Sequence, residues 1–342
     1  IQFHPTGLGR TGILMSEAVR GEGGYLLNAE GERFMKKYAP NKMELASRDV
    51  VAKAIEDEIA AGRGFGSGLN AYVVADLRHL GPEVIIEKLH GIRDLALCFE
   101  HCDPLTQPVP IRPTCHYIMG GIDVVDYKTC ATALPGLFAS GEASCISIHG
   151  ANRLGGNSLA DGVVFGKVSG AGAADYAETN EQPNVDAELA AKAKEWEDKF
   201  VEVTTREGGR PVVEIRDALA NAMWNKVGIF RNEEGITEAL TEINQLIEEY
   251  KTCYVGDPDR TYNMAFVNYC EIGSMLTVAK AIAMGALHRR ESRGAHVRED
   301  FPKRNDERYL KHSLISLNAD GEYELSERDV VFTKYEPQER KY

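Results

Sequence analysis

Glycine is unevenly distributed along this chain, and that feature constrains the fold most. The sequence holds 33 glycines in 342 residues, which exceeds the ~7% usual for globular proteins. They gather in two segments, residues 7–24 and 120–170. Glycine lacks a Cβ, so it lets the backbone turn tightly or approach a ligand closely. We therefore predict that both segments form loops around a ligand, and that a helix from Ser158 onward packs tightly on a sheet.

Charge excludes several classes of function. The chain has 52 acidic and 39 basic residues, for a formal net charge of −13. Nucleic acids and anionic membranes recruit clustered positive charge, so we predict neither as a partner. No run of 18 apolar residues occurs, and we therefore predict no direct membrane insertion.

The seven cysteines form no C-x-x-C pair. Cys98, His101 and Cys102 offer three possible zinc ligands, but a second ligand pair at finger-like spacing is missing. We predict reduced thiols and no metal site.

The fold class predicted from these patterns is α+β or α/β with several domains. Residues 1–110 combine strand and helix signals, and 111–172 are rich in glycine. Residues 173–295 carry charged helical patterns, including an apolar stripe at Ile236, Leu240, Ile243 and Ile247. Residues 296–342 alternate charge with short β-like runs.

Individual elements follow from caps, periodicity and breakers. Ser47 predicts the start of a helix that continues to about residue 61. The other residues predicted to be helical are 187–202, 213–250 and about 264–291. The predicted short strands cover residues 72–74, 135–142 and 330–332.

Polar residues that could carry chemistry occur in four clusters. Glu17 and Arg20 are three residues apart, so they share one face of a helical turn; the alternative is a surface ion pair worth ~0–1 kcal/mol. Ser47-Arg48-Asp49, taken alone, is a capped helix start. His116 precedes a double glycine, which favours contact with a ligand over a place in the core.

The fourth cluster carries the strongest signal. Glu142 lies at the end of a predicted strand, a position that suits a ribose hydroxyl, and residues 149–159 form a glycine-rich entry to a helix N-terminus. A flavin fits this cluster, although no G-x-G-x-x-G follows an early strand. Together the four clusters supply histidines, arginines and a hydroxyl that would suit a small dicarboxylate.

These motifs resemble the flavoprotein subunit of succinate dehydrogenases and fumarate reductases. The resemblance runs in order along the whole chain, over Phe3–Gly7, Leu45–Asp49, His116–Gly121, His149–Leu159, Arg290–His296 and Asp300–Asp306. It implies a capping domain over 1–110, the second segment of a Rossmann-like FAD-binding domain over 111–172, a helical domain over 173–295 and a C-terminal segment over 296–342. It also implies that the chain is the C-terminal part of a longer subunit, whose dinucleotide fingerprint and flavin-linking histidine precede Ile1.

The resemblance assigns catalytic roles. It makes Arg48 the proton donor to the substrate carbon, and it makes Glu17 and Arg20 the relay that reprotonates Arg48. From the residues alone Glu17 is the better acid, because a free guanidinium has a pKa above ~12. Ser16 stands where the family more often has threonine.

The resemblance also assigns binding roles. The predicted substrate-binding residues are His4, which also counts among the catalytic residues, together with Ser16, Glu17, His116 and Arg153. The predicted FAD contacts are Tyr117, Glu142, Asn157, Ser158 and Leu159.

The function that the resemblance implies is interconversion of succinate and fumarate, with hydride passing to or from FAD N5 and the proton passing through Arg48. Two alternatives are an L-aspartate oxidase-like flavoenzyme and an inactive fragment that serves only as a capping or docking portion. The implied partners are an iron–sulfur subunit and membrane anchor subunits. The implied setting is electron transport in anaerobic respiration or the tricarboxylic acid cycle, at the cytoplasmic face of the inner membrane.

Overall fold

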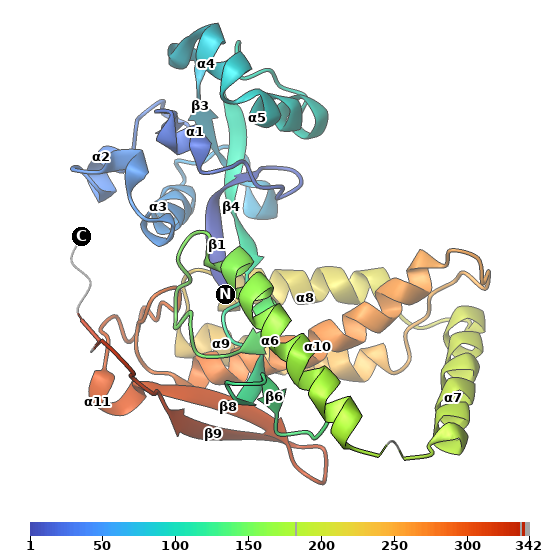
Figure 1. Cartoon of the computed structure of the whole chain (residues 1–342). Coiled ribbons are helices and arrows are strands. Elements are labelled where there is room, and N and C mark those ends of the chain that lie inside the picture. The colour runs from blue at the N-terminus through green and yellow to red at the C-terminus, as the bar shows by residue number, and fades with distance from the viewer. Residues whose placement is uncertain (182, 336, 339–342) are drawn as a thin grey trace. The chain divides into compact units, whose positions relative to one another are not determined.

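An antiparallel sheet of four strands organises residues 1–119 and 149–155, which form one of two compact units in the chain. The computed structural model describes residues 1–181, 183–335 and 337–338 (Figure 1). The strand order in this sheet is β1-β4-β3-β2. The strands are β1 (Gln2–Leu8), β2 (Tyr25–Leu27), β3 (Val73–Asp76) and β4 (Val109–Tyr117). β3 confirms the strand predicted at residues 72–74.

The pairing of β1 with β4 fixes the positions of two predicted site histidines. All seven residues of β1 are buried, and His4 lies opposite Thr114 in the register. Gly7 is required here, because a Cβ at this position would lie 2.7 Å from the Thr114 side chain. His4 and His116 therefore extend from adjacent strands of one sheet.

Helix α3 (Arg48–Ala60) packs against this sheet through Val51 and Ile55, which are fully buried. The predicted helix over 48–61 is confirmed to within one residue. Ser47 is the N-cap residue, but its side chain makes no capping hydrogen bond. The shorter helical elements of this unit are α1 (Ala18–Gly21), α2 (Met35–Tyr38), η1 (Met43–Leu45), η2 (Gly68–Asn70), η3 (Arg78–Leu80), α4 (Gly81–Glu87), α5 (His90–Leu95) and η4 (Ala96–Glu100).

The second unit comprises residues 120–148 and 156–342 and begins with a small sheet of order β6-β5-β7. Its strands are β5 (Ile122–Asp126), β6 (Ala131–Thr132) and β7 (Ser144–Cys145), and the short helix η5 (Gly141–Ala143) precedes β7. The strand predicted over 135–142 is wrong. Pro135 and Gly136 turn the chain, and only an isolated bridge joins Phe138 to Ala131.

Helix α6 (Asn157–Thr179) follows this sheet, as the small residues from Ser158 onward predict. Phe165 and Val168 pack against a cluster that contains Val124 of β5. A Cβ at Gly172 would lie 2.7 Å from the Thr129 carbonyl oxygen, so glycine permits this close approach.

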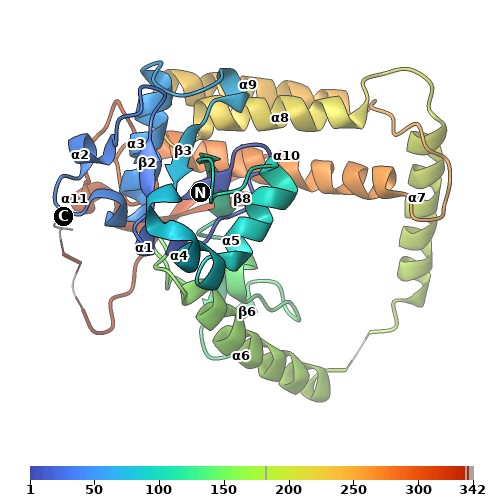
Figure 2. The same cartoon turned by 90° about the horizontal axis from the view of Figure 1, so that it is seen from above.

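Four longer helices follow, and three of them build one hydrophobic core. Helices α8 (Val212–Val227), α9 (Glu233–Tyr250) and α10 (Met264–His288) pack side by side, while α7 (Asp186–Thr205) contributes Val203 (Figure 2). The predicted stripe on α9 is confirmed, since Ile236 and Ile243 are fully buried and Leu240 and Ile247 pack against the same core.

Gly228 separates α8 from α9. A Cβ at this position would lie 2.3 Å from the Trp224 carbonyl oxygen, so the turn requires glycine. The Asn232 side chain then accepts a hydrogen bond of 2.9 Å from the Gly235 N–H and caps α9.

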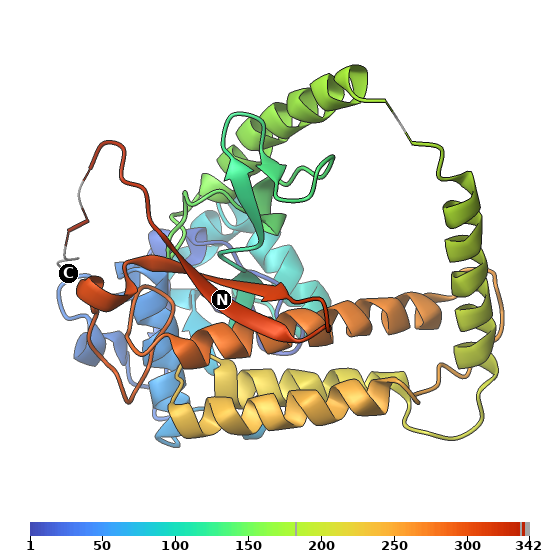
Figure 3. The same ribbon diagram turned by 90° about the horizontal axis from the view of Figure 1, so that it is seen from below.

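The last part of the second unit contains α11 (Asp306–Tyr309) and an antiparallel hairpin of β8 (Lys311–Leu317) and β9 (Tyr323–Asp329), which contacts α10 (Figure 3). The strand predicted over 330–332 is wrong. Lys311 pairs with Asp329, so residue 330 has no partner in β8, which begins at Lys311.

The four-part division stays a prediction. Its first boundary, between residues 110 and 111, falls inside β4.

Helix α10 is the one helix in the described residues that is long and apolar enough to cross a bilayer by length and composition. Tyr269, Ile272 and Leu276 on this helix belong to the core with α8 and α9. The predicted absence of membrane insertion stays a prediction.

The buried stripe gives a test of the bundle. Ile243→Ala should lower the free energy of unfolding by about 2–5 kcal/mol, because it removes buried methyl groups and leaves a cavity. The control is Leu189→Ala on α7, where the side chain is 61% exposed, and its effect should stay within about 0.5 kcal/mol. Denaturant unfolding measures both, and equal effects would contradict this packing.

Candidate functional site

Glu17 joins two arginines into a continuous chain of ion pairs. Its Oε1 accepts a hydrogen bond of 2.7 Å from Arg20 Nη2, and its Oε2 accepts one of 2.7 Å from Arg48 Nη2. The hydrogen bond from Arg48 is the largest cause that lowers the pKa of Glu17, and both guanidinium charges add to it. The structure thus brings together the three residues of the predicted relay, and Glu17 is ionised between two cations.

Arg20 is buried, with 2% of its surface exposed. Besides Glu17, its guanidinium reaches two backbone carbonyls: Nη1 donates to the oxygens of Glu44 at 2.6 Å and Ala46 at 2.9 Å. Burial is the main cause that lowers the pKa of Arg20. The predicted Glu17–Arg20 pair is therefore not a surface ion pair, because one partner is desolvated and fixed on three sides.

Arg48 is the first residue of α3, and its side chain is 22% exposed. Gly155 lies close to it, since a Cβ built at Gly155 would be 3.3 Å from Arg48 Nη2. A larger residue at position 155 would displace this guanidinium.

His4 is buried beside these charges. Burial, followed by the Arg48 charge, lowers the pKa of His4 to about 3, so the imidazole is neutral at physiological pH. Its Nδ1 lies 3.1 Å from Thr6 Oγ1, which itself donates to the Met15 carbonyl at 2.7 Å. Thr6 is one residue that the sequence reasoning did not assign, although it lies in the quoted Phe3–Gly7 motif.

His116 and Arg153 form a second group. Arg153 Nη2 lies 2.9 Å from His116 Nε2, and the Arg153 guanidinium lies over the Tyr117 ring at 4.2 Å. Burial, followed by the Arg153 charge, lowers the pKa of His116 to about 4. The His4 and His116 rings meet edge to face at 5.4 Å, which joins this group to the first.

Gln2 holds the loop that carries Arg153. Its side-chain nitrogen donates to Asn152 Oδ1 and to the Arg153 carbonyl, both at 2.7 Å. Sequence reasoning missed this residue, because the contact spans about 150 positions and no local pattern indicates it.

Ser16 is exposed, and its hydroxyl accepts a hydrogen bond of 3.0 Å from the Ala18 N–H at the start of α1. This bond holds Ser16 next to Glu17 in the loop before α1.

The predicted flavin contacts lie in different places. Asn157, Ser158 and Leu159 form the first turn of α6, and the Leu159 N–H donates a hydrogen bond of 3.2 Å to the Gly156 carbonyl. Gly156 precedes this turn with φ of 82°. Leu159 is 76% exposed.

Glu142 lies in η5, which packs on α6. The positive φ of Gly141 places that turn close to Gly162. The N-terminus of a long helix, an apolar side chain and a carboxylate fit a dinucleotide such as FAD. Tyr117, by contrast, belongs to the first unit and is buried, with its hydroxyl 3.1 Å from His149 Nε2.

Within the described residues, no group of three or more His, Cys, Asp or Glu side chains could hold a metal ion. Cys98 is exposed and Cys102 is buried. The absence of a metal site stays a prediction.

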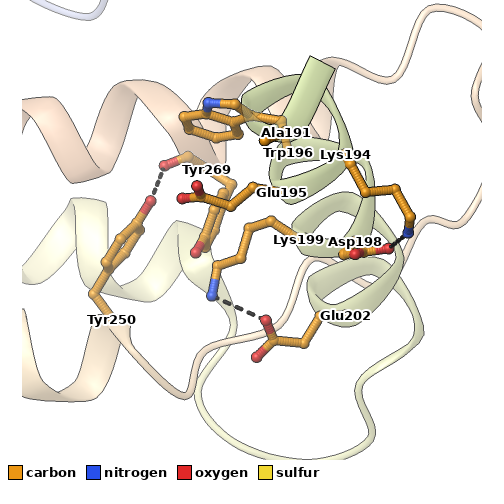
Figure 4. Close-up of a pocket in the computed structure, with 9 residues that line it drawn as sticks. All are labelled: Ala191, Lys194, Glu195, Trp196, Asp198, Lys199, Glu202, Tyr250 and Tyr269. Atoms are coloured by element: carbon orange, nitrogen blue, oxygen red, sulfur yellow. Dashed lines mark hydrogen bonds and ion pairs between the residues drawn. The ribbon is translucent and has the colours of Figure 1, made fainter. Parts of the chain in front are cut away.

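A separate pocket of about 830 Å³ lies along α7 in the second unit (Figure 4). Four of its charged side chains form ion pairs with one another: Lys199 pairs with Glu202 at 3.1 Å, and Lys194 pairs with Asp198. None of the predicted site residues lines this pocket, which is bordered by Ala191, Lys194, Glu195, Trp196, Asp198, Lys199, Glu202, Tyr250 and Tyr269.

Two different family models match the two ends of the chain. Residues 1–159 match the family described as FAD binding domain, and residues 216–342 match the family described as fumarate reductase flavoprotein C-term. The 8-methylmenaquinol:fumarate reductase flavoprotein subunit of Wolinella succinogenes is 46% identical over 100% of this chain and 56% of its own length. The chain belongs to the fumarate reductase and succinate dehydrogenase flavoprotein family.

Other members of this family agree. The succinate dehydrogenase flavoprotein subunit of Rickettsia conorii is 40% identical over 97% of this chain and 57% of its own length. A solved structure of the E. coli quinol fumarate reductase matches with a TM-score of 0.90 and 38% identity, over 99% of this chain and 60% of that one. The chain thus spans 56–60% of the length of these three relatives. The predicted family, the mixed α/β fold and FAD as the family's cofactor are confirmed.

The two neutral histidines make stability depend on pH. In the unfolded chain a histidine protonates near pH 6.5, whereas folded His4 and His116 stay neutral down to about pH 3 and 4. The unfolded state binds more protons below pH 6.5, so the free energy of unfolding should fall as pH drops from about 6.5 to 4.

His116→Gln should make this decline shallower, and His90→Gln, which changes an exposed side chain, serves as the control. Urea unfolding between pH 7 and pH 4 measures the slope. An unchanged slope in His116→Gln would show that His116 is protonated in the folded protein.

Proposed function

We propose that this chain supplies the dicarboxylate-binding and proton-transfer residues of a flavin-dependent oxidoreductase that interconverts succinate and fumarate. The observation that carries the proposal is the Arg20–Glu17–Arg48 chain of ion pairs in one unit with neutral His4 and the His116–Arg153 pair. The names of the relatives in Wolinella and Rickettsia agree with this activity.

The substrate would be held by charge-assisted hydrogen bonds. Arg153 supplies a guanidinium, and neutral His4 and His116 supply N–H donors. Each charge-assisted bond contributes about 1.5–3 kcal/mol, so three or four of them can hold a dianion after the cost of ordering it. Ser16, next to Glu17, adds a hydroxyl.

The proton step assigns different tasks to the relay residues. Arg48 Nη2 would give its proton to the substrate carbon in fumarate reduction and take it back in the reverse direction. A guanidinium is a weak acid, so the step requires close positioning. Glu17 would restore the Arg48 proton by accepting a proton from water and passing it to Arg48, because its carboxylate is bonded to Arg48 and 52% of the side chain is exposed. Arg20 fixes Glu17 in place.

FAD, when bound, supplies hydride acceptance and donation at its N5 atom. Residues that would hold it are Asn157, Ser158 and Leu159 at the N-terminus of α6, with Glu142 at a ribose. Helix N-termini favour negatively polarised groups, which supports this assignment. Tyr117, also predicted to contact FAD, would do so from its place beside Arg153, whose guanidinium lies over the Tyr117 ring.

We also propose that the protein works in a membrane-associated respiratory complex. The matched E. coli structure is a quinol fumarate reductase, which supports partner subunits. An iron–sulfur subunit would carry electrons onward to a membrane anchor at the cytoplasmic face of the inner membrane. The flavoprotein would attach peripherally through these partners.

Loss of the proton donor gives the first test. In the native holoenzyme, Arg48→Ala should lower kcat by at least about 100-fold, since general acid catalysis contributes about 10²–10⁴-fold. Dicarboxylate binding should remain measurable, because His4, His116 and Arg153 are unchanged.

The matched control is Arg93→Ala, which removes a guanidinium paired with Asp103 at 2.7 Å in the same unit. Its kcat should match the wild type. Retained turnover in Arg48→Ala would refute the assignment of the donor.

Substrate choice gives the second test. Succinate should be oxidised and L-aspartate should not, because the α-ammonium group would face Arg48 and Arg153 while Glu17 is already paired with two guanidiniums. Parallel assays with each substrate and an artificial electron acceptor measure the two rates. A faster rate with aspartate would favour the L-aspartate oxidase alternative, and no rate with either substrate in the native holoenzyme would refute the proposed function.

A further inference from the structure

Next to Arg20 lies another ion pair, between Arg33 and Glu44, which has no role in the proposed substrate binding or proton transfer. Glu44 is 2% exposed, and its carboxylate accepts two hydrogen bonds from Arg33, of 2.8 Å from Nε and 2.6 Å from Nη2. The Leu26 N–H of β2 adds a third contact, at 3.3 Å. This bidentate geometry fixes the direction of the Glu44 side chain.

The same residue holds the relay through its backbone. The Glu44 carbonyl oxygen accepts the 2.6 Å hydrogen bond from Arg20 Nη1. Glu44 therefore faces two arginines at once: its side chain binds Arg33, and its main chain binds Arg20. Movement of the residue would move a carbonyl that orients Arg20.

The backbone at this point is strained. Met43 has φ of 50°, in the left-handed region that non-glycine residues adopt only when their surroundings enforce it. Met43 opens the turn η1, and α3 begins at Arg48. Only a few residues thus separate the strained turn from the second guanidinium of the relay.

Arg33 is itself fixed on its other side. Its guanidinium carbon lies 3.9 Å from the centre of the Tyr25 ring. The Tyr25 ring also stacks on the His79 ring, with 3.8 Å between the ring centres. Arg33 is therefore held against a layer of two rings, and it can hold Glu44 and the strained turn in place.

We propose that Glu44, clamped by Arg33, is a positioning residue for the relay: it holds the turn whose carbonyls orient Arg20, and through Arg20 it places Glu17 against Arg48. This inference rests on the proposed function. Glu44 touches neither substrate nor flavin in this scheme, so its loss should impair proton transfer more than substrate binding.

Glu44→Gln in the native holoenzyme tests the role in turnover. Glutamine keeps the shape but turns an N–H donor toward the Arg33 donors. We expect kcat to fall about 10- to 100-fold, as small misplacements of catalytic groups do. Malonate is a dicarboxylate that does not react, and its binding can be followed by the change in flavin absorbance. Its Kd should change by less than about threefold, because the substitution leaves the residues that bind the carboxylates unchanged.

Glu58→Gln is the matched control. Glu58 is another buried glutamate of the same unit, with a bidentate pair to Arg63 at 2.6 and 2.7 Å. In the described part of the chain its carboxylate accepts hydrogen bonds from Asn28, Tyr38 and Arg63, and not from Arg20. This variant should lose thermal stability like Glu44→Gln but keep kcat near the wild-type value.

A second measurement tests the coupling between Glu44 and Arg20 without measuring turnover. In a double-mutant cycle on melting temperature, Glu44→Gln should lower Tm less in an Arg20→Lys background than in the wild type, because the two residues share one contact. Glu58→Gln should lower Tm equally in both backgrounds.

Additive Tm changes for Glu44 and Arg20 would overturn the clamp, and so would a kcat loss in Glu44→Gln no larger than that in Glu58→Gln. If the wild-type holoenzyme turns over neither succinate nor fumarate, the proposed function fails and the positioning role falls with it. Wild-type turnover with additive Tm changes refutes the clamp alone.

Discussion

The burial of one guanidinium sets the requirements for the rest of the site. A charge removed from water must regain its lost hydrogen bonds and charge balance inside the protein. The two Nη atoms of Arg20 do so with the Glu17 carboxylate and two carbonyls from the turn before α3. The carboxylate that balances Arg20 also bonds Arg48. The site is therefore a shared ion network in which a shift of any member changes the surroundings of the other two.

The same concentration of positive charge explains the neutral histidines. His4 and His116 lie among guanidiniums in a desolvated region, and both effects disfavour a further cation. A neutral imidazole can donate one hydrogen bond without adding charge. The net charge of −13 thus coexists with a buried region where cations gather, which suits a dianion. Binding of that dianion would reduce the electrostatic repulsion among the cations.

Sequence reasoning found the residues whose relation is local. The spacing of Glu17 and Arg20 predicts their contact, and Ser47 predicts the start of the helix that places Arg48. It could not find Gln2, because the contact with Arg153 joins β1 to a loop that lies 151 residues away in the sequence. Glu44 carries no motif of its own, and its importance depends on where its backbone carbonyl points. The strands predicted over 135–142 and 330–332 failed for a related reason: β-like residues form a strand only where a partner strand continues beside them.

Two adjacent glycines show why the glycine-rich segments resist a single explanation. At Gly155 the constraint concerns a side chain, since a Cβ would press against the Arg48 guanidinium. At Gly156 it concerns the backbone, which takes φ of 82° as it enters α6. The chain passes from the first compact unit to the second between these two residues. One motif thus adjoins the Arg48 guanidinium on one side and begins a helix on the other, and an alanine at either position would disturb a different part of the structure.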